Sequence, residues 1–161
     1  MNYTCCFTGH RKICAEHMVR LPEVLDRALD ILIRSGVTTF RTGGAIGFDT
    51  LAALMVLEKK EKHPHISLEL CLPCRDQSQK WDDESREAYN YILERADKVT
   101  CLHEKYVRGC MHERNRYMVE GSHFCLGYSL SDKSGSAYTL KYAKEKGLKV
   151  INFAYVSFGG K

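Results

Sequence analysis

The feature that most constrains the fold of this chain is a regular alternation of two hydrophobic patterns. Short, continuous apolar runs are separated by segments in which apolar residues recur at i, i+3, i+4 and i+7, the spacing of one helix face. Strands that are apolar on both faces are typical of a parallel sheet covered by helices on both sides. The sequence therefore predicts an α/β fold, a Rossmann-like doubly wound three-layer sandwich with a mainly parallel sheet of about six strands. The expected strands cover residues 3–7, 37–40, 66–72, 98–102, 123–128 and 150–153.

Helices are predicted between these strands. The first of them begins at Leu21-Pro22, where proline suits the first helical position, and ends before Gly36. The others are expected over about 47–60, up to about 95, over about 109–120, and from 134–136 to 147. No linker, repeat or change in composition marks a second domain. We therefore expect one Rossmann-like domain over residues 1–154, followed by a C-terminal tail over residues 155–161.

Composition narrows the classes of function. A formal net charge of +4 over 161 residues suits an anionic small ligand, and it does not favour nucleic acid as a partner. No apolar run approaches the length of a membrane span, and the N-terminus lacks the layout of a signal peptide. The sequence thus predicts a cytoplasmic protein without a membrane partner. It leaves the oligomeric state open, a homo-oligomer included.

Eight cysteines raise the question of disulfides or a metal site. Most of them lie inside apolar runs, where free cysteine behaves as a small hydrophobic residue. The one CxxC motif, Cys71–Cys74, has no second CxxC and no closely spaced histidine pair to complete a set of metal ligands. We therefore expect buried, reduced thiols and no bound metal.

The predicted fold also indicates where a ligand would bind. In doubly wound sheets, ligands occupy the crevice beyond the carboxyl ends of the strands. Segments with unusual polar or glycine-rich sequence follow four of the expected strands, so they should converge on this edge. These segments are Thr8–Arg11, Thr42–Asp49, Pro73–Gln77 and Tyr128–Thr139.

The segment Thr42–Asp49 leads from a strand into a helix and contains Gly43, Gly44 and Gly47. Glycine permits close approach of the backbone, and a helix N-terminus attracts phosphate, so this loop is suited to the floor of a nucleotide pocket. A tight turn without any ligand would use the same glycines. Asp49 lies in the first turn of the following helix, where it would either cap the helix or accept a hydrogen bond from a ribose hydroxyl.

Three other places carry side chains that could bind a ligand. His10 and Arg11 would donate to phosphate or ribose oxygens, or else belong to a solvated turn. Asn115 lies beside the apolar face of its helix, bordered by Arg114, so a neighbouring backbone group or a ligand must satisfy its amide. Trp81 would be either a core aromatic or a lid over a base.

The motifs TGHR (Thr8–Arg11), TGGAIGFD (Thr42–Asp49), LPCxxQxxxW (Leu72–Trp81) and RNRYMV (Arg114–Val119), taken in this order, resemble the YpsA-like members of the SLOG superfamily. The resemblance spans nearly the whole chain, from Thr8 to about residue 152. The superfamily also contains the DprA/Smf DNA-processing proteins and the LOG-type nucleoside-phosphate lyases. The resemblance implies a Rossmann-like fold that binds a nucleotide or a nucleotide-derived ligand of the NAD or ADP-ribose kind. It implies no established reaction.

Comparison with the LOG-type enzymes separates binding from catalysis. Their MHERKxxM helix resembles Met111–Met118, with Arg114 in the place of the functional arginine and Asn115 in the place of the lysine. Their PGGxGTxxE motif resembles Ser134–Tyr142, but Tyr142 stands where those enzymes carry the catalytic glutamate. Hydrolysis of a glycosidic bond by that route needs a carboxylate. The resemblance therefore implies binding more strongly than it implies a reaction.

The sequence thus predicts a protein that senses or sequesters a nucleotide-derived ligand, with phosphate on the Gly43-Gly44 turn and a second anion site at Gly135-Ser136. One alternative is a LOG-like hydrolase acting on an N-glycosidic or phosphate bond, with Asp49 and Arg114 as candidate catalytic residues. The second alternative is DprA-like binding of single-stranded DNA. The one cofactor that the sequence suggests is a bound nucleotide, namely NAD, ADP-ribose or a nucleoside phosphate. The predicted ligand-binding residues are Thr8, Gly9, His10, Arg11, Thr42, Gly43, Gly44, Gly47, Asp49, Gln77, Arg114, Asn115, Gly135, Ser136 and Thr139.

Overall fold

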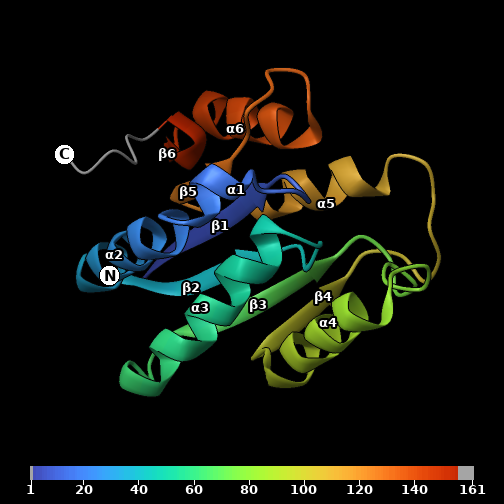
Figure 1. Ribbon diagram of the computed structural model, residues 1–161, viewed down its shortest axis with the longest axis horizontal. Coiled ribbons are helices and arrows are strands. Elements are labelled where there is room, and N and C mark those ends of the chain that lie inside the picture. Colours follow the sequence, from blue (N-terminus) through green and yellow to red (C-terminus); the bar gives the residue numbers. More distant parts are fainter. Residues whose placement is uncertain (1, 156–161) are drawn as a thin grey trace.

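Six parallel strands form the centre of the structure, a computed structural model that describes residues 2–155 (Figure 1). Their order across the sheet is β4-β3-β2-β1-β5-β6, and every neighbouring pair is parallel. The predicted Rossmann-like fold is thus confirmed. The strands are Tyr3–Gly9 (β1), Val37–Thr42 (β2), Ser67–Leu72 (β3), Lys98–Cys101 (β4), Phe124–Tyr128 (β5) and Lys149–Asn152 (β6).

Helices cover both faces of the sheet and complete the three layers (Figure 1). α2, α3 and α4 pack together on one face, whereas α5 and α6 pack on the other. The helices are Ala15–Met18 (α1), Leu21–Arg34 (α2), Phe48–Lys62 (α3), Asp83–Arg95 (α4), Cys110–Val119 (α5) and Gly135–Glu145 (α6), with a short 3-10 helix at Phe153–Tyr155. The sequence predicted neither α1 nor the 3-10 helix, because elements this short show no apolar periodicity.

Alternating side chains of the central strand divide the core into two clusters. Phe7 of β1 belongs to the larger cluster, on the side of α2 and α3, together with Phe40 and Phe48. Cys6 belongs to a smaller cluster on the opposite side, together with Met118 of α5. Because β1 is buried on both faces, its sequence is a continuous apolar run rather than an alternating one.

The carboxyl ends of the two central strands extend further than predicted. β1 continues to Gly9 and β2 to Thr42, so Thr8 and Thr42 belong to the sheet rather than to loops. Of the predicted tail over residues 155–161, only Tyr155 lies within the described residues. None of the helices in the described part of the chain is long and apolar enough to cross a membrane.

Candidate functional site

The order of the strands changes direction at β1. From β1 to β4 each new strand lies further toward one edge of the sheet, whereas β5 and β6 lie on the other side of β1. The structure is hollowed at this point. β1 pairs with β2 on one side and with β5 on the other, so the segments that follow β1 and β5 leave a crevice between them. A cavity of about 260 Å³ lies there. It brings together most of the residues that the sequence indicated. Its lining consists of Thr8, Gly9, His10, Arg11, Ala45, Asp49, Met111, His112, Arg114, Asn115, Ser134, Gly135 and Ser136.

Asp49 is the least satisfied group at this cavity. It lies in the first turn of α3 and is only 4% exposed. Gly47 rather than Asp49 occupies the N-cap of the helix, and Oδ1 of Asp49 has no hydrogen-bond partner among the described residues. Burial raises the pKa of Asp49 to about 6, although the charge of Arg114 and the amides of Ala45 and Gly43 act in the opposite direction. A buried acceptor therefore remains available to a ligand.

Arg114 of α5 is as deeply buried as Asp49, with 3% of its surface exposed. Its Nη1 donates to the carbonyl oxygens of Gly43 at 2.7 Å and Cys71 at 3.3 Å, and its Nε donates to Oδ1 of Asn115 at 2.9 Å. Within the described part of the chain, Nη2 of Arg114 makes no hydrogen bond. Among the same residues, Arg114 forms no ion pair with Asp49. Burial lowers the pKa of Arg114 and the Asp49 charge raises it. Opposite charges thus share the cavity without a direct contact.

His10 is positioned by the loop that follows β5. Its Nε2 accepts the N–H of Leu130 at 2.8 Å. A nitrogen that accepts a hydrogen bond carries no proton, so the neutral ring holds its proton on Nδ1 and can donate it. Burial lowers the pKa of His10, which favours this neutral form. The side chain is therefore suited to donate a hydrogen bond to a ligand oxygen.

The start of α6 closes the cavity on the side of β5. Ser134 is the N-cap of this helix, and its Oγ accepts the N–H of Ala137 at 3.0 Å. The amides of Gly135 and Ser136 precede the first intrahelical hydrogen bond, so the helix supplies no acceptor for them. A Cβ atom on Gly135 would meet nothing within 4 Å. An anion can therefore approach these N–H groups closely.

The glycines of the loop between β2 and α3 pack against the protein itself. A Cβ on Gly43 would lie 2.3 Å from Nη1 of Arg114, and one on Gly44 would lie 2.9 Å from Leu70. Gly47 has a φ of +91°, and a Cβ there would lie 2.3 Å from the carbonyl oxygen of Arg11. The side chain of Arg114 thus occupies the space in which the sequence placed a phosphate. None of these three glycines is among the residues that line the cavity.

Thr42, Gln77 and Thr139 also lie outside the cavity lining, and each stabilises a segment of the site. The hydroxyl of Thr42 donates to the backbone carbonyl of Asp49 at 3.3 Å. Gln77 donates from Nε2 to the carbonyl of Gly43 at 3.2 Å, which joins the segment after β3 to the glycine loop. Thr139 donates to a carbonyl in the first turn of α6 at 2.9 Å.

A second cavity of about 520 Å³ adjoins the first, and Arg11 and Met111 line both of them. Gln77 and Trp81 belong to its walls. Trp81 is partly exposed and packs edge-on against Tyr89, with 5.3 Å between the ring centroids. The tryptophan therefore contributes to both the edge of the core and the wall of this cavity.

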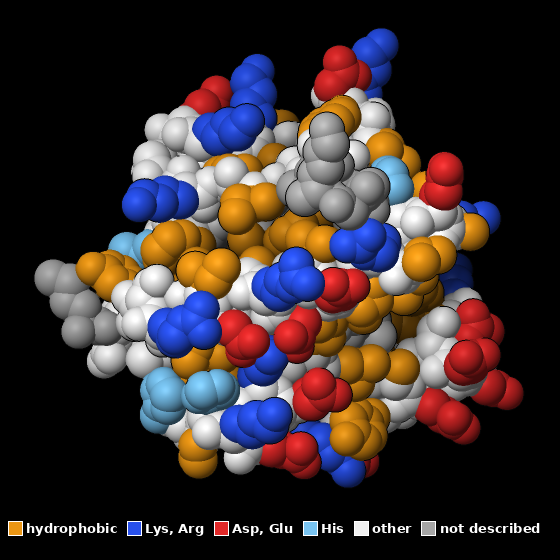
Figure 2. Space-filling model, turned by 60° about the vertical axis from the view of Figure 1, so that its left-hand side comes forward, with side chains coloured by type: hydrophobic (Ala, Val, Ile, Leu, Met, Phe, Trp, Pro, Cys, Tyr) orange, Lys and Arg blue, Asp and Glu red, His pale blue; other side chains and the backbone are white. Residues whose placement is uncertain are grey.

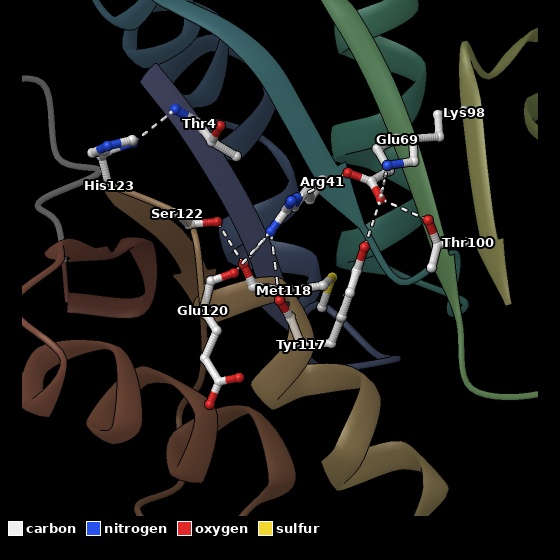
Figure 3. Close-up of polar contacts among 10 residues, drawn as sticks. All are labelled: Thr4, Arg41, Glu69, Lys98, Thr100, Tyr117, Met118, Glu120, Ser122 and His123. Carbon is white, nitrogen blue, oxygen red and sulfur yellow. Dashed lines mark hydrogen bonds and ion pairs between the residues drawn. The ribbon is translucent and has the colours of Figure 1, made fainter. Parts of the chain in front are cut away.

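α5 is tied to the sheet by a partly buried network around the Arg41–Glu69 ion pair (Figure 3). Arg41 of β2 donates from Nε to Oε1 of Glu69 in β3 at 2.9 Å, and from Nη1 to the carbonyl of Glu120 at 3.0 Å, just after the end of α5. Tyr117 of α5 donates to Oε2 of Glu69 at 3.3 Å. Burial alone would raise the pKa of Glu69, but the hydrogen bond from Thr100 and the charge of Arg41 lower it. This network fixes the helix that carries Arg114.

Sequence reasoning missed four residues of the cavity lining, Ala45, Met111, His112 and Ser134. Helical spacing offered one signal, since Met111 lies three residues before Arg114 and thus on the same face of α5. The other signal was serine as an N-cap at the predicted start of α6. His112 is exposed at the rim, and its ring contacts Tyr138 edge-on.

Tyr142, in the place of the LOG-type glutamate, lies two turns into α6 and does not line the cavity. Its hydroxyl is hydrogen-bonded to Glu120. Asp49 is the one carboxylate among the lining residues. All eight cysteines are free thiols. Within the described residues, no group of three or more His, Cys, Asp and Glu side chains is placed to hold a metal ion.

Comparison with known proteins gives concordant matches. A protein-family model described as the YspA SLOG family, YpsA, matches residues 7–157. A UPF0398 protein of Halalkalibacterium halodurans is 33% identical over 129 residues, which cover 78% of this chain and 68% of the relative. The uncharacterised SPbeta prophage-derived protein YoqJ of Bacillus subtilis is 29% identical over 141 residues, which cover 80% of this chain and 82% of YoqJ.

Solved structures of DNA processing protein A, DprA, share the fold. The Streptococcus pneumoniae protein matches with a TM-score of 0.66 at 17% identity, over 92% of this chain but only 49% of DprA. The Helicobacter pylori protein, whose structure describes a single-stranded DNA binding mode, matches with a TM-score of 0.65 at 18% identity, over 92% of this chain and 63% of DprA. At these identities the likeness shows the fold alone, and the chain spans less than two thirds of either DprA.

Proposed function

The chain belongs to the YpsA family of SLOG proteins, and we propose that it binds a nucleotide or a nucleotide-derived ligand, of the NAD or ADP-ribose kind, in the cavity between β1 and β5. The protein would sense or sequester this ligand. The observation that carries the proposal is the unpartnered Oδ1 of Asp49, a 4% exposed carboxylate at the wall of that cavity. A buried acceptor without a donor costs free energy that a ligand hydroxyl can recover.

The proposed ligand places its phosphate at the start of α6. The free amides of Gly135 and Ser136 bind the anion, and the positive charges of Arg114 and Arg11 balance it. A ribose hydroxyl then donates to Oδ1 of Asp49. The volume of about 260 Å³ lies below the roughly 300–1,000 Å³ of typical small-molecule sites, so this cavity suits the ribose phosphate part of the ligand, and the rest of the ligand would extend beyond it.

A thermal-shift panel of GMP, AMP, NAD and ADP-ribose tests this function. At least one nucleotide is expected to raise the melting temperature of the wild-type protein. Asp49→Asn is expected to weaken its binding about tenfold or more, because a neutral amide replaces the charged acceptor and accepts a weaker hydrogen bond. Asp83→Asn is the matched control, because the side chain of Asp83 is 94% exposed on α4. No shift with any nucleotide of the panel would contradict the proposal.

A second candidate function is hydrolysis of an N-glycosidic or phosphate bond in the same ligand. The observation in its favour is Asp49 itself, because a carboxyl whose pKa is near 6 can exchange a proton close to neutral pH. Chromatography of nucleoside monophosphates, NAD and ADP-ribose after incubation with the protein tests it. Turnover that Asp49→Asn abolishes supports an enzyme, whereas recovery of every nucleotide intact supports binding alone.

A third candidate is binding of single-stranded DNA, which the fold shared with DprA supports. On the face shown in Figure 2, lysine and arginine side chains are interspersed with acidic ones rather than gathered into a basic stripe. A gel-shift titration at increasing salt tests this candidate, since binding driven by phosphate contacts must weaken steeply as salt rises. Association with short oligonucleotides that occurs only at low salt and does not saturate as the protein concentration rises would be non-specific and would count against this candidate.

A further inference from the structure

The second, larger cavity has no role in the function proposed above. It encloses about 520 Å³ and shares Arg11 and Met111 with the candidate site. A ligand with its phosphate at the start of α6 can therefore extend past these two side chains into the larger space. A nucleotide has one remaining part to place there, its base.

The walls of this cavity suit a flat aromatic ring. Trp81 is held edge-on against Tyr89, so its indole has a fixed orientation. Tyr106, from the loop after β4, is 64% exposed and lines the same cavity. Bases stack on aromatic side chains whatever their identity, so these residues select a planar ring but do not select which ring.

Asp76 supplies the selection. It lines the cavity, its backbone carbonyl accepts the N–H of Gln79 at 3.1 Å, and its Oδ1 has no hydrogen-bond partner among the described residues. Its neighbour Gln77 already donates to the carbonyl of Gly43 at 3.2 Å and accepts from Arg114 at 3.5 Å. The thiol of Cys74 also hydrogen-bonds to the Asp76 side chain, and the other polar side chains of the lining, such as Gln79 and Lys80, are exposed. Oδ1 of Asp76 is thus the buried polar atom of this lining that lacks a partner, and a carboxylate oxygen only accepts hydrogen bonds.

A ring edge that faces a carboxylate must therefore present N–H donors. Guanine presents N1–H and its 2-amino group side by side, and a carboxylate can accept from both of these donors. Adenine presents its 6-amino group beside the lone pair of N1, which an oxygen of the carboxylate repels. We propose that the second cavity binds the guanine base of a guanine nucleotide, with the ring on Trp81 and the N1–H and 2-amino groups on Asp76. This inference rests on the function proposed above for the phosphate end of the ligand.

Tryptophan fluorescence tests the inference, because Trp81 is the single tryptophan of the chain. In the wild-type protein, GMP is expected to quench Trp81 and to bind at least about tenfold more tightly than AMP, since a site built for two donors rejects a base that lacks them. IMP, which keeps N1–H but lacks the 2-amino group, is expected to fall between the two.

The variant Asp76→Asn distinguishes a guanine-selective site from an aromatic site that stacks any base. An asparagine amide can pair with adenine, so the variant is expected to lose or reverse the preference for GMP. Asp83→Asn is expected to keep it. Circular dichroism verifies that each variant is folded. If Asp76→Asn does not fold, the order of the affinities for GMP, IMP and AMP in the wild-type protein decides the question.

Two results would overturn the inference, and they differ in what they leave standing. Equal affinities for GMP and AMP, or a preference for GMP that persists in Asp76→Asn, would remove the guanine assignment and leave the phosphate site intact. Absence of binding by all three nucleotides would remove the proposed function as well.

Discussion

At the scale of single residues, the site contains a group that costs the protein stability. Asp49 is buried, and its pKa in the folded protein is raised to about 6 from an ordinary value of 3.8. The folded state therefore binds the proton more tightly than the unfolded state does. Such groups are common at functional sites, where the stability lost in the free protein is recovered when a ligand binds.

Asp49→Asn is accordingly expected to stabilise the protein in a pH-dependent way. Below about pH 4 the carboxyl is protonated in both states, so the variant and the wild type differ little. Between about pH 4 and 6 the unfolded state loses its proton first, and the wild-type protein becomes less stable; above pH 6 the deficit is constant at about 3 kcal/mol. Urea denaturation at pH 4 and pH 7 measures this difference. A variant that is less stable than the wild type at pH 7 would show that Asp49 is a structural residue.

Glycine substitutions distinguish packing from ligand contact. Gly44 has a φ of +72°, and a Cβ there would approach Leu70 to 2.9 Å, so Gly44→Ala is expected to reduce the free energy of unfolding by about 1–3 kcal/mol. Gly135→Ala is the matched control, because its Cβ would meet nothing within 4 Å and alanine favours the helix. Thermal denaturation measures both variants. Equal stabilities for the two would contradict the packing role of the glycine-rich loop.

At the scale of elements, the site depends on the position of α5, which the Arg41–Glu69 ion pair fixes from the far side (Figure 3). Arg41→Met is expected to cost roughly 1–3 kcal/mol, because it removes the closest positive charge from the buried Glu69 and leaves only the exposed Lys98, at 3.9 Å, as its ion-pair partner. It should also weaken nucleotide binding, since α5 carries Arg114. Denaturation and a binding titration measure the two effects.

The double variant Arg41→Met with Glu69→Leu is the control for that prediction. Replacing both charges with apolar side chains is expected to recover most of the stability, because no unpaired charge remains. Binding should stay weakened, since the hydrogen bonds from Arg41 to the end of α5 are still absent. Full recovery of both properties would mean that the ion pair does not position the helix.

The elements themselves were largely predictable from the sequence. Long segments such as α2 show their apolar period clearly, and buried parallel strands such as β5 are continuous apolar runs. What the glycine-rich loop packs against was not predictable from the sequence, because the side chain next to Gly43 is that of Arg114, 71 residues away along the chain. The second cavity was equally hidden, since Asp76 and Trp81 come from the loop after β3, whereas Tyr106 comes from the loop after β4.

At the scale of the whole molecule, the order of the strands makes the site. The divergence of the chain on either side of β1 places His10, Asp49, Arg114 and Gly135 around one cavity, although they come from four separate segments. The segments that carry His10, Asp49 and Gly135 were placed at the carboxyl edge of the sheet from the sequence, whereas Arg114 was singled out from its helix and from the resemblance to the LOG-type enzymes. Topology thus determined that they would meet, and packing determined which of their residues face the ligand.

Calorimetric titration of GMP and AMP into the wild-type protein and two Gly135 variants tests the central claim most directly. Gly135 has open space around it, and an acidic side chain in the first turn of α6 favours the helix, so Gly135→Asp should fold as well as Gly135→Asn. We predict that Gly135→Asn binds the nucleotide and that Gly135→Asp loses at least about tenfold in affinity, since its carboxylate repels the phosphate. Equal affinities for the two variants would show that the phosphate does not bind at the start of α6.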